Sequence, residues 1–184
     1  MNAVLMEQKR PLATLEERDD REMLRVCFVC TGNTCRSPMA AAVANALAAG
    51  ELAAYPDAVR EALSPRLQAT SRGLYAAEGE PIADNALRAL EEAEVLPTPC
   101  DDYRNHAARN LTDAEASQFD LLVAMSAGHA MELMMRHPEA SSRIVCMPTP
   151  ISDPYGGDLA VYRACLAEIT EGVKALLFAE RASE

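Results

Sequence analysis

A nine-residue run of small and turn-forming residues near the start of the chain joins a cysteine to an arginine and to a helix start. The run reads Cys-Thr-Gly-Asn-Thr-Cys-Arg-Ser-Pro and extends from Cys30 to Pro38. The apolar residues 24–29 precede it, and the helix-like stretch 39–47 follows it. We therefore expect a strand that ends at Cys30, a linking loop of six residues, and a helix that starts at Ser37. Such a loop can wrap around one tetrahedral oxyanion and direct a sulfur at its phosphorus.

The residue types in this loop favour anion binding. Gly32 and Asn33 most easily adopt unusual backbone angles, so the loop can turn several N–H groups inward as a nest. Ser37 is a favoured N-cap and Pro38 is favoured at the first helical position, so a helix dipole would add positive potential at the same point. Arg36 supplies a planar, permanently charged fork to two anion oxygens.

The positive field of this loop predicts a reactive cysteine. It favours the thiolate of Cys30 over the thiol and so makes the sulfur a nucleophile near neutral pH. A lone cysteine at a strand end is usually a packing residue, but here the glycine, the asparagine, the helix start and the preceding strand all agree. The residues that we expect to bind phosphate are Thr31, Gly32, Asn33, Thr34, Cys35, Arg36 and Ser37.

The segment 26–40 resembles the phosphate-binding loop of the low-molecular-weight protein tyrosine phosphatases. A second match lies far downstream, where Asp153-Pro154-Tyr155 is followed by two glycines and a helix-like stretch. Weaker matches fall between the two, in the order that the family has them: Ser71-Arg72-Gly73, His106 to Arg109, Leu111-Thr112, and Phe119 to Met125. The resemblance covers roughly residues 24–180, which is nearly the whole chain.

The resemblance implies a reaction without metal or cofactor. Cys30 would attack phosphorus and form a cysteinyl-phosphate, while Arg36 and the loop amides stabilise charge on the equatorial oxygens. Asp153 would protonate the leaving group and then activate water for the second step. Taken alone, the Asp-Pro-Tyr-Gly-Gly segment has the composition of an ordinary turn. We therefore expect Asp153 to be catalytic only in combination with the loop that carries Cys30.

The resemblance also implies a supporting network around the loop. Ser37 would donate a hydrogen bond to the Cys30 sulfur and help to hold it ionised. Asn33 would lock the loop through hydrogen bonds with Ser37, Ser71 and His106. For Ser71 and His106, a satisfied polar residue near the surface is the alternative interpretation.

Thr31 bears on the substrate. In the tyrosine-specific branch of the family, the residue after the nucleophile is usually a larger aliphatic one. A threonine there, together with Thr34 and the short acidic-loop segment, is similar to the arginine phosphatase branch. A small polar side chain suits a planar guanidinium, which the Asp153 carboxylate can face, and Tyr75 and Tyr155 are expected to form aromatic walls at the rim. We expect a preference for phosphoarginine, with phosphotyrosine as the alternative.

The six cysteines could also indicate a metal site or a redox pair. Cys27 and Cys30 have the spacing of such a pair, but positions i and i+3 of a strand point to opposite faces. There is no second pair with this spacing and the three histidines are not spaced as zinc ligands, so we expect no metal. Cys35 lies inside the anion loop, where it could form a disulfide with an oxidised Cys30. The alternative is a small buried side chain beneath the loop.

A rival function is arsenate reduction coupled to thioredoxin. Some arsenate reductases resemble this fold and loop, but they need two further cysteines just after the strand expected to end at Met125. Residues 126–131 contain no cysteine, and Pro38 stands where such reductases usually carry glutamine. A non-catalytic phosphate-binding module is a third possibility that nothing in the sequence supports.

The sequence predicts the α/β class, as a single three-layer domain with a central four-stranded parallel sheet flanked by helices and a phosphate-binding loop after the first strand. We expect a charged extension over residues 1–23, of unknown role, and the phosphatase domain over 24–184. The expected strands span 24–30, 67–71, 121–125 and 143–147, and the expected helices span 38–49, 83–94, 126–137 and 158–178.

Two helical patterns predict core packing. The last helix carries apolar residues at three- and four-residue steps, namely Leu159, Tyr162, Leu166, Ile169, Val173 and Leu176. The cluster of Met131, Met134 and Met135 is likewise expected to pack in the interior.

The formal net charge of −11 argues against nucleic acid and anionic membrane surfaces as partners. It also means that anion capture depends on the local field of the loop. We expect phosphorylated proteins as substrates, and free active-site thiols suit a reducing cytoplasm. No apolar stretch is long enough for a signal peptide or a membrane span. The oligomeric state stays open.

Overall fold

The computed structural model describes residues 23–53 and 67–178. The extension predicted for residues 1–23 therefore lies outside the described residues except for its last position. The strands are β1 (Leu24–Cys30), β2 (Leu67–Gly73), β3 (Leu121–Ala124) and β4 (Ile144–Cys146). The helices are α2 (Arg36–Ala53), α4 (Asp84–Glu92), α5 (Asp113–Ala116), α6 (Ala127–Arg136) and α7 (Leu159–Leu177), with short 3-10 helices η2 (Tyr103–Asn105) and η3 (Pro138–Arg143).

The four strands form one parallel sheet in the order β2-β1-β3-β4, which confirms the predicted fold class. β1 lies in the interior of the sheet, with β2 on one side and β3 on the other. The chain first moves from β1 to β2 and then crosses back to β3, so the strand order reverses beside β1. Ligands in open parallel sheets bind at such a reversal, beyond the carboxyl ends of the strands.

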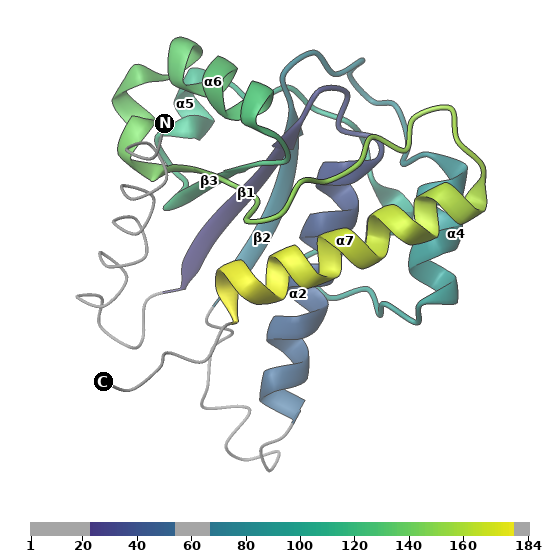
Figure 1. The fold of residues 1–184 in the computed structure, drawn as a ribbon. Helices are drawn as coiled ribbons and strands as arrows, with labels where there is room; N and C mark the ends of the chain where they lie inside the picture. Colours follow the sequence, from purple (N-terminus) through teal and green to yellow (C-terminus); the bar gives the residue numbers. More distant parts are fainter. Residues whose placement is uncertain (1–22, 54–66, 179–184) are drawn as a thin grey trace.

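Helices cover both faces of the sheet, as expected of a three-layer domain (Figure 1). Alternate residues of β1 face the two layers: Val26 and Phe28 belong to the core shared with α2, α4 and α7, whereas Cys27 and Val29 belong to the core beneath α5 and α6. All four side chains are fully buried. A strand buried on both faces reads as a nearly continuous apolar run, which is why β1 is so apparent in the sequence.

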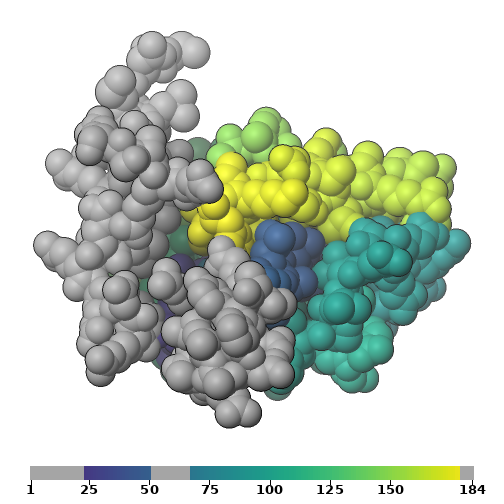
Figure 2. Space-filling model, turned by 90° about the horizontal axis from the view of Figure 1, so that it is seen from below, coloured from purple at the N-terminus to yellow at the C-terminus, as the bar shows by residue number. Residues whose placement is uncertain are grey.

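Helix α7 packs across α2 and α4. Seen from below, the yellow atoms of α7 lie against the blue atoms of α2 (Figure 2). The apolar stripe predicted along α7 is confirmed, because all of its members belong to the core on this side of the sheet or pack against it. None of the helices within the described ranges is long and apolar enough to cross a membrane.

The prediction for the methionines of α6 is wrong. Met131 and Met135 expose 66% and 73% of their surface, and Met134 is also exposed. The buried side chains of α6 are instead His129 and Leu133, which are four residues apart and face the sheet together.

The start of α2 also differs from the expectation. The helix begins at Arg36, so Ser37 lies inside its first turn and is not the N-cap. Pro38 is tolerated there because the first N–H groups of a helix need no intrahelical acceptor. The Ser37 hydroxyl is fully buried and is used in side-chain contacts beneath the loop.

Candidate active site

The loop between β1 and α2 is held from outside through its carbonyl groups. The backbone N–H groups of Leu74, Tyr75 and Ala83 donate to the carbonyls of residues 30, 31 and 34, at 3.0, 2.9 and 2.9 Å. In a trans peptide, the N–H of the next residue points opposite to the carbonyl. Pinning the carbonyls outward therefore directs the N–H groups of residues 31, 32 and 35 toward the inside of the loop. The residues after β2 and before α4 thus shape a cup of amide donors.

Close approach of β2 to this loop depends on Gly73. A Cβ atom placed there would lie 2.8 Å from the Thr31 carbonyl oxygen and 2.8 Å from the Cβ of Ala76. Any side chain at this position would therefore displace the loop or its support.

Asn33 fixes the conformation of the loop. Its φ of 56° lies in the left-handed region, which asparagine tolerates better than most residues, whereas Gly32 has no positive φ. The fully buried Asn33 side chain donates to Ser37 Oγ at 3.0 Å and to Ser71 Oγ at 2.9 Å. Its Oδ1 accepts the backbone N–H of Arg109 at 2.9 Å.

His106 adds a fourth contact to this network. Its Nε2 lies 2.7 Å from the Asn33 carbonyl oxygen, and burial lowers the pKa of the ring. Because a carbonyl oxygen only accepts, Nε2 carries the proton and donates it here. The structure thus brings together Asn33, Ser37, Ser71 and His106, the four residues of the supporting network.

The Cys30 sulfur sits at the base of the loop. Its residue is only 2% exposed, and Sγ lies 3.0 Å from Ser37 Oγ. Since Ser37 Oγ accepts a hydrogen bond from Asn33, its own hydrogen is available for the sulfur. The Arg72 carbonyl is the alternative acceptor, at 3.4 Å. The shorter contact to sulfur favours Ser37 as the donor to Cys30.

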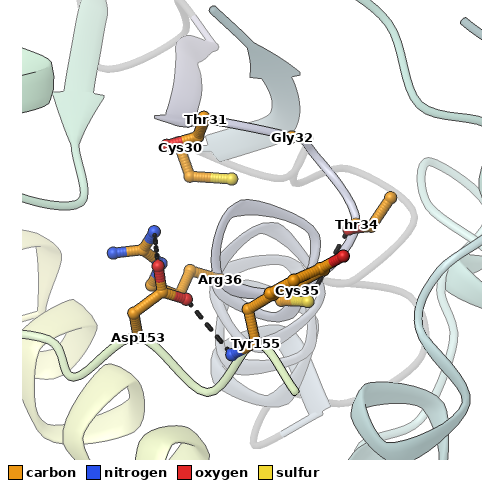
Figure 3. Close-up of a pocket in the computed structure, with 8 residues that line it drawn as sticks. All are labelled: Cys30, Thr31, Gly32, Thr34, Cys35, Arg36, Asp153 and Tyr155. Atoms are coloured by element: carbon orange, nitrogen blue, oxygen red, sulfur yellow. Dashed lines mark hydrogen bonds and ion pairs between the residues drawn. The ribbon is translucent and has the colours of Figure 1, made fainter. Parts of the chain in front are cut away.

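Arg36 and Asp153 meet across a pocket of about 250 Å³ above this sulfur. Arg36 Nη2 donates to Asp153 Oδ2 at 2.9 Å, as Figure 3 shows. The Arg36 side chain is 9% exposed and that of Asp153 is 57% exposed. The Tyr155 backbone N–H donates to the other carboxylate oxygen at 3.2 Å and holds the aspartate at the start of its turn. The residues lining the pocket are Cys30, Thr31, Gly32, Thr34, Cys35, Arg36, Asp153 and Tyr155.

The two tyrosines expected at the rim are placed differently. Tyr155 lines the pocket and is 82% exposed, as a rim residue would be. Tyr75 does not line it. The Arg136 guanidinium instead lies 4.4 Å from the centre of the Tyr75 ring, and the Tyr75 hydroxyl donates to the Glu132 carboxylate. These contacts hold Tyr75 against α6, beside the loop but outside the pocket wall.

Cys27 and Cys35, the two cysteines nearest to Cys30 in the sequence, lie in different surroundings. Cys27 faces the layer opposite to the pocket, and burial raises the pKa of its thiol to about 12. Cys35 is buried and lines the pocket, with Sγ 3.2 Å from the Tyr162 hydroxyl. Burial, followed by the contact with Cys35, raises the pKa of Tyr162. No group of three or more metal-ligating side chains occurs in residues 23–53 and 67–178.

One residue of the site, His129, was not predicted. Its Nε2 lies 2.9 Å from Thr31 Oγ1 and its Nδ1 lies 2.8 Å from Ser126 Oγ. Burial and the nearby charge of Arg36 lower the pKa of the ring. The sequence feature that could have indicated His129 is its position shortly after β3. The carboxyl end of β3 lies at the same edge of the sheet as the loop.

Comparison with known proteins agrees with this geometry. Residues 25–184 match the family model described as low molecular weight phosphotyrosine protein phosphatase. A protein-arginine-phosphatase from Geobacillus stearothermophilus is 30% identical over 152 residues, which cover 79% of this chain and 88% of the relative. The family match spans the loop, the sheet and the Asp153 turn.

Solved structures share the fold. A low molecular weight protein tyrosine phosphatase from T. tengcongensis superposes with a TM-score of 0.67 at 31% identity, covering 84% of this chain and 97% of that one. A cysteine-to-serine mutant of an arginine phosphatase, with a phosphorylated active-site serine, gives a TM-score of 0.67 at 25% identity and covers 83% and 93% of the two chains. The chain therefore belongs to the low-molecular-weight phosphotyrosine protein phosphatase family and is a hydrolase of that family.

Proposed function

We propose that this protein removes phosphoryl groups from arginine side chains of proteins through a cysteinyl-phosphate on Cys30. The observation that carries the proposal is the pocket itself, in which the Cys30 sulfur lies beneath a cup of amide donors and Arg36 faces Asp153 above it. The phosphorylated serine in the mutant relative supports covalent transfer to this position.

In the first step, the Cys30 sulfur attacks phosphorus and the bond from phosphorus to the leaving atom breaks. For phosphoarginine this is a P–N bond, and the departing guanidino nitrogen takes a proton from the Asp153 carboxyl. The amides of the loop and the Arg36 fork stabilise the charge on the three equatorial oxygens. The Ser37 hydroxyl, 3.0 Å from the sulfur, stabilises the thiolate before attack and again when it leaves.

In the second step, the Asp153 carboxylate takes a proton from water, whose oxygen attacks phosphorus. The P–S bond breaks, inorganic phosphate leaves, and Cys30 returns to the thiolate. The place of Asp153 in the pocket lining, with a side chain that is more than half exposed and so accessible to water, supports this role in both proton transfers. Neither step needs an electron acceptor or a metal-bound water.

The preference for arginine is inferred from the pocket wall. Thr31 and Thr34 both line the pocket and give it small, polar sides. A guanidinium is planar and cationic, so it suits a polar wall with the Asp153 carboxylate at the mouth. Phosphotyrosine, which needs an apolar slot for its ring, is the alternative substrate.

The test compares kcat/KM for phosphoarginine and phosphotyrosine peptides of the same flanking sequence. We expect the phosphoarginine peptide to be favoured, and Thr31→Ile to move the preference toward phosphotyrosine by about tenfold or more. Thr170→Ile, the same change on α7, is the control and should leave the preference as it is. A faster reaction with phosphotyrosine in the parent protein, or an unchanged preference in Thr31→Ile, would overturn the assignment.

A further inference from the structure

A chain of three side chains connects the pocket wall to the start of α6. Thr31 Oγ1 lies 2.9 Å from His129 Nε2, and Ser126 Oγ lies 2.8 Å from His129 Nδ1. Thr31 lines the pocket next to Cys30, whereas Ser126 is the N-cap of α6. His129 is 8% exposed, so its ring is enclosed between these two hydroxyl groups.

The protonation of the ring follows from its neighbours. Burial and the positive charge of Arg36 lower the pKa of His129, and the negative charges of Asp153 and Glu132 only partly oppose them, so the ring is neutral at pH 7 with one N–H. Ser126 Oγ already accepts the backbone N–H of His129 at 3.3 Å. Its hydroxyl hydrogen is therefore best used on Nδ1, which leaves the ring proton on Nε2.

In this tautomer, Nε2–H donates to Thr31 Oγ1. The Thr31 side chain is then held at one rotamer against α6, and its own hydroxyl hydrogen is not needed for the contact with the ring. The Thr31 hydroxyl can therefore donate this hydrogen to a ligand bound in the pocket. The contact joins residues 98 positions apart, so it depends on the fold and not on the local loop sequence.

We infer that His129 is a positioning residue for substrate preference, which acts by holding the Thr31 side chain as a small polar wall of the pocket. The inference deepens the proposed function and rests on it, because it assigns the orientation of Thr31 to a group outside the phosphate-binding loop. Loss of the His129 contact would free the Thr31 side chain to change rotamer and present its methyl group or its hydroxyl to the leaving group.

Two amide substitutions separate the two contacts of the ring. Glutamine has the length to place its amide group where Nε2 lies, so His129→Gln retains a partner for Thr31. Asparagine reaches only the position of Nδ1, so His129→Asn retains the contact with Ser126 and loses the contact with Thr31. The measured quantity is the ratio of kcat/KM for phosphoarginine and phosphotyrosine peptides, with Tm recorded for each variant.

We expect His129→Asn to change this ratio by about tenfold and His129→Gln by less than about threefold. Thr31→Val should change it as much as His129→Asn does, and adding His129→Asn to Thr31→Val should have little further effect. His137→Asn is the matched control, because this second buried histidine lies at the other end of α6 and should leave the ratio unchanged.

Three outcomes would overturn the inference: an unchanged ratio in His129→Asn, an equal change in His129→Gln, or additive effects in the double variant. These outcomes are distinct from failure of the proposed function. If the parent protein favours phosphotyrosine, the arginine assignment fails, but the coupling between His129 and Thr31 is still measured by how the ratio moves.

Discussion

Arg36 and Asp153 form an ion pair across the pocket, with 2.9 Å between Nη2 and Oδ2. In the proposed mechanism both residues act on the phosphoryl group, Arg36 by binding its oxygens and Asp153 as an acid. A phosphoryl group that engages the Arg36 fork must compete with the Asp153 carboxylate for it. The same competition releases Asp153 to face the leaving group, so substrate binding and placement of the acid are coupled.

Replacing Asp153 by asparagine should strengthen oxyanion binding while it slows turnover. The neutral amide would neither compete as strongly for Arg36 nor repel the anion, and because the Asp153 side chain is 57% exposed we expect only about a two- to fivefold gain. The measurement is the inhibition constant of inorganic phosphate in Asp153→Asn, with kcat recorded in parallel. Glu171→Gln, the same loss of charge on the far part of α7, should leave this constant unchanged. Weaker phosphate binding in Asp153→Asn would contradict the competition.

Asn33 should be needed for both the backbone angle and the hydrogen bonds of the loop. Asn33→Ala loses three side-chain hydrogen bonds and places alanine at a positive φ, so we expect a loss of about 2–4 kcal/mol in the free energy of unfolding. Asn33→Gly accepts the angle but still lacks the contacts. In urea unfolding, the free energy of unfolding should therefore be highest for the parent, lower for Asn33→Gly and lowest for Asn33→Ala. We expect a low kcat/KM in both variants. Full activity in Asn33→Gly would show that the network has no part in catalysis.

Asp101 should make the stability of the protein depend on pH. Burial raises the pKa of its carboxyl from 3.8 to about 6, and a hydrogen bond from Asn45 only partly opposes this. Between these values the folded state binds more protons than the unfolded state, so this group costs stability as the pH rises from about 4 to about 6. The pKa values of His106 and His129 are lowered, so these two groups act in the opposite sense and their contribution to stability is lost as the pH falls.

Asp101→Asn removes the carboxyl contribution and leaves the histidines in place. Because Asp101 is partly exposed, we expect the variant to be more stable than the parent by roughly 1–3 kcal/mol at pH 7.5 and equal to it near pH 4. The measurement is urea unfolding at both values. A difference that is the same at pH 4 and pH 7.5 would mean that the carboxyl does not titrate in this window.

Cys35 should protect Cys30 from irreversible oxidation. Both cysteines line the pocket, so once peroxide has oxidised Cys30 to a sulfenic acid, the Cys35 thiol can attack that sulfur, give up its proton to the departing hydroxyl group, release water and form a disulfide. We expect the parent to recover activity with dithiothreitol after peroxide treatment and Cys35→Ser to recover less. Cys146→Ser, away from the pocket, is the control. Equal recovery in Cys35→Ser would leave Cys35 as a packing residue against Tyr162.

How far the sequence predicts this molecule depends on the range of the interactions involved. The predicted bounds of β1 agree with the observed ones, because an apolar run that leads into a turn-forming loop is a local pattern. The prediction that Ser37 is an N-cap was wrong. It was based on the Ser-Pro pair, which fits a local capping rule, but contacts with Cys30 and Asn33 place the Ser37 hydroxyl beneath the loop. β2 extends to Gly73 because its last residues pair with the end of β1.

Other features were beyond local reasoning or were overlooked. The contact of His129 with Thr31 depends on β1 and β3 being neighbours, which no local pattern encodes. The exposed methionines show that three apolar residues in one helix do not by themselves define its buried face. The capping box of α5, with Thr112 and Glu115, was readable in the sequence and was missed.

The most direct test of the proposed chemistry is to trap the covalent intermediate. With an aryl phosphate, whose leaving group needs little protonation, Asp153→Ala should form the cysteinyl-phosphate and hydrolyse it slowly. After a denaturing quench, peptide mass spectrometry should find one phosphoryl group on Cys30, and Cys30→Ser should show no turnover. A phosphoryl group on any other residue, or turnover that survives in Cys30→Ser, would contradict a cysteinyl-phosphate mechanism at this site.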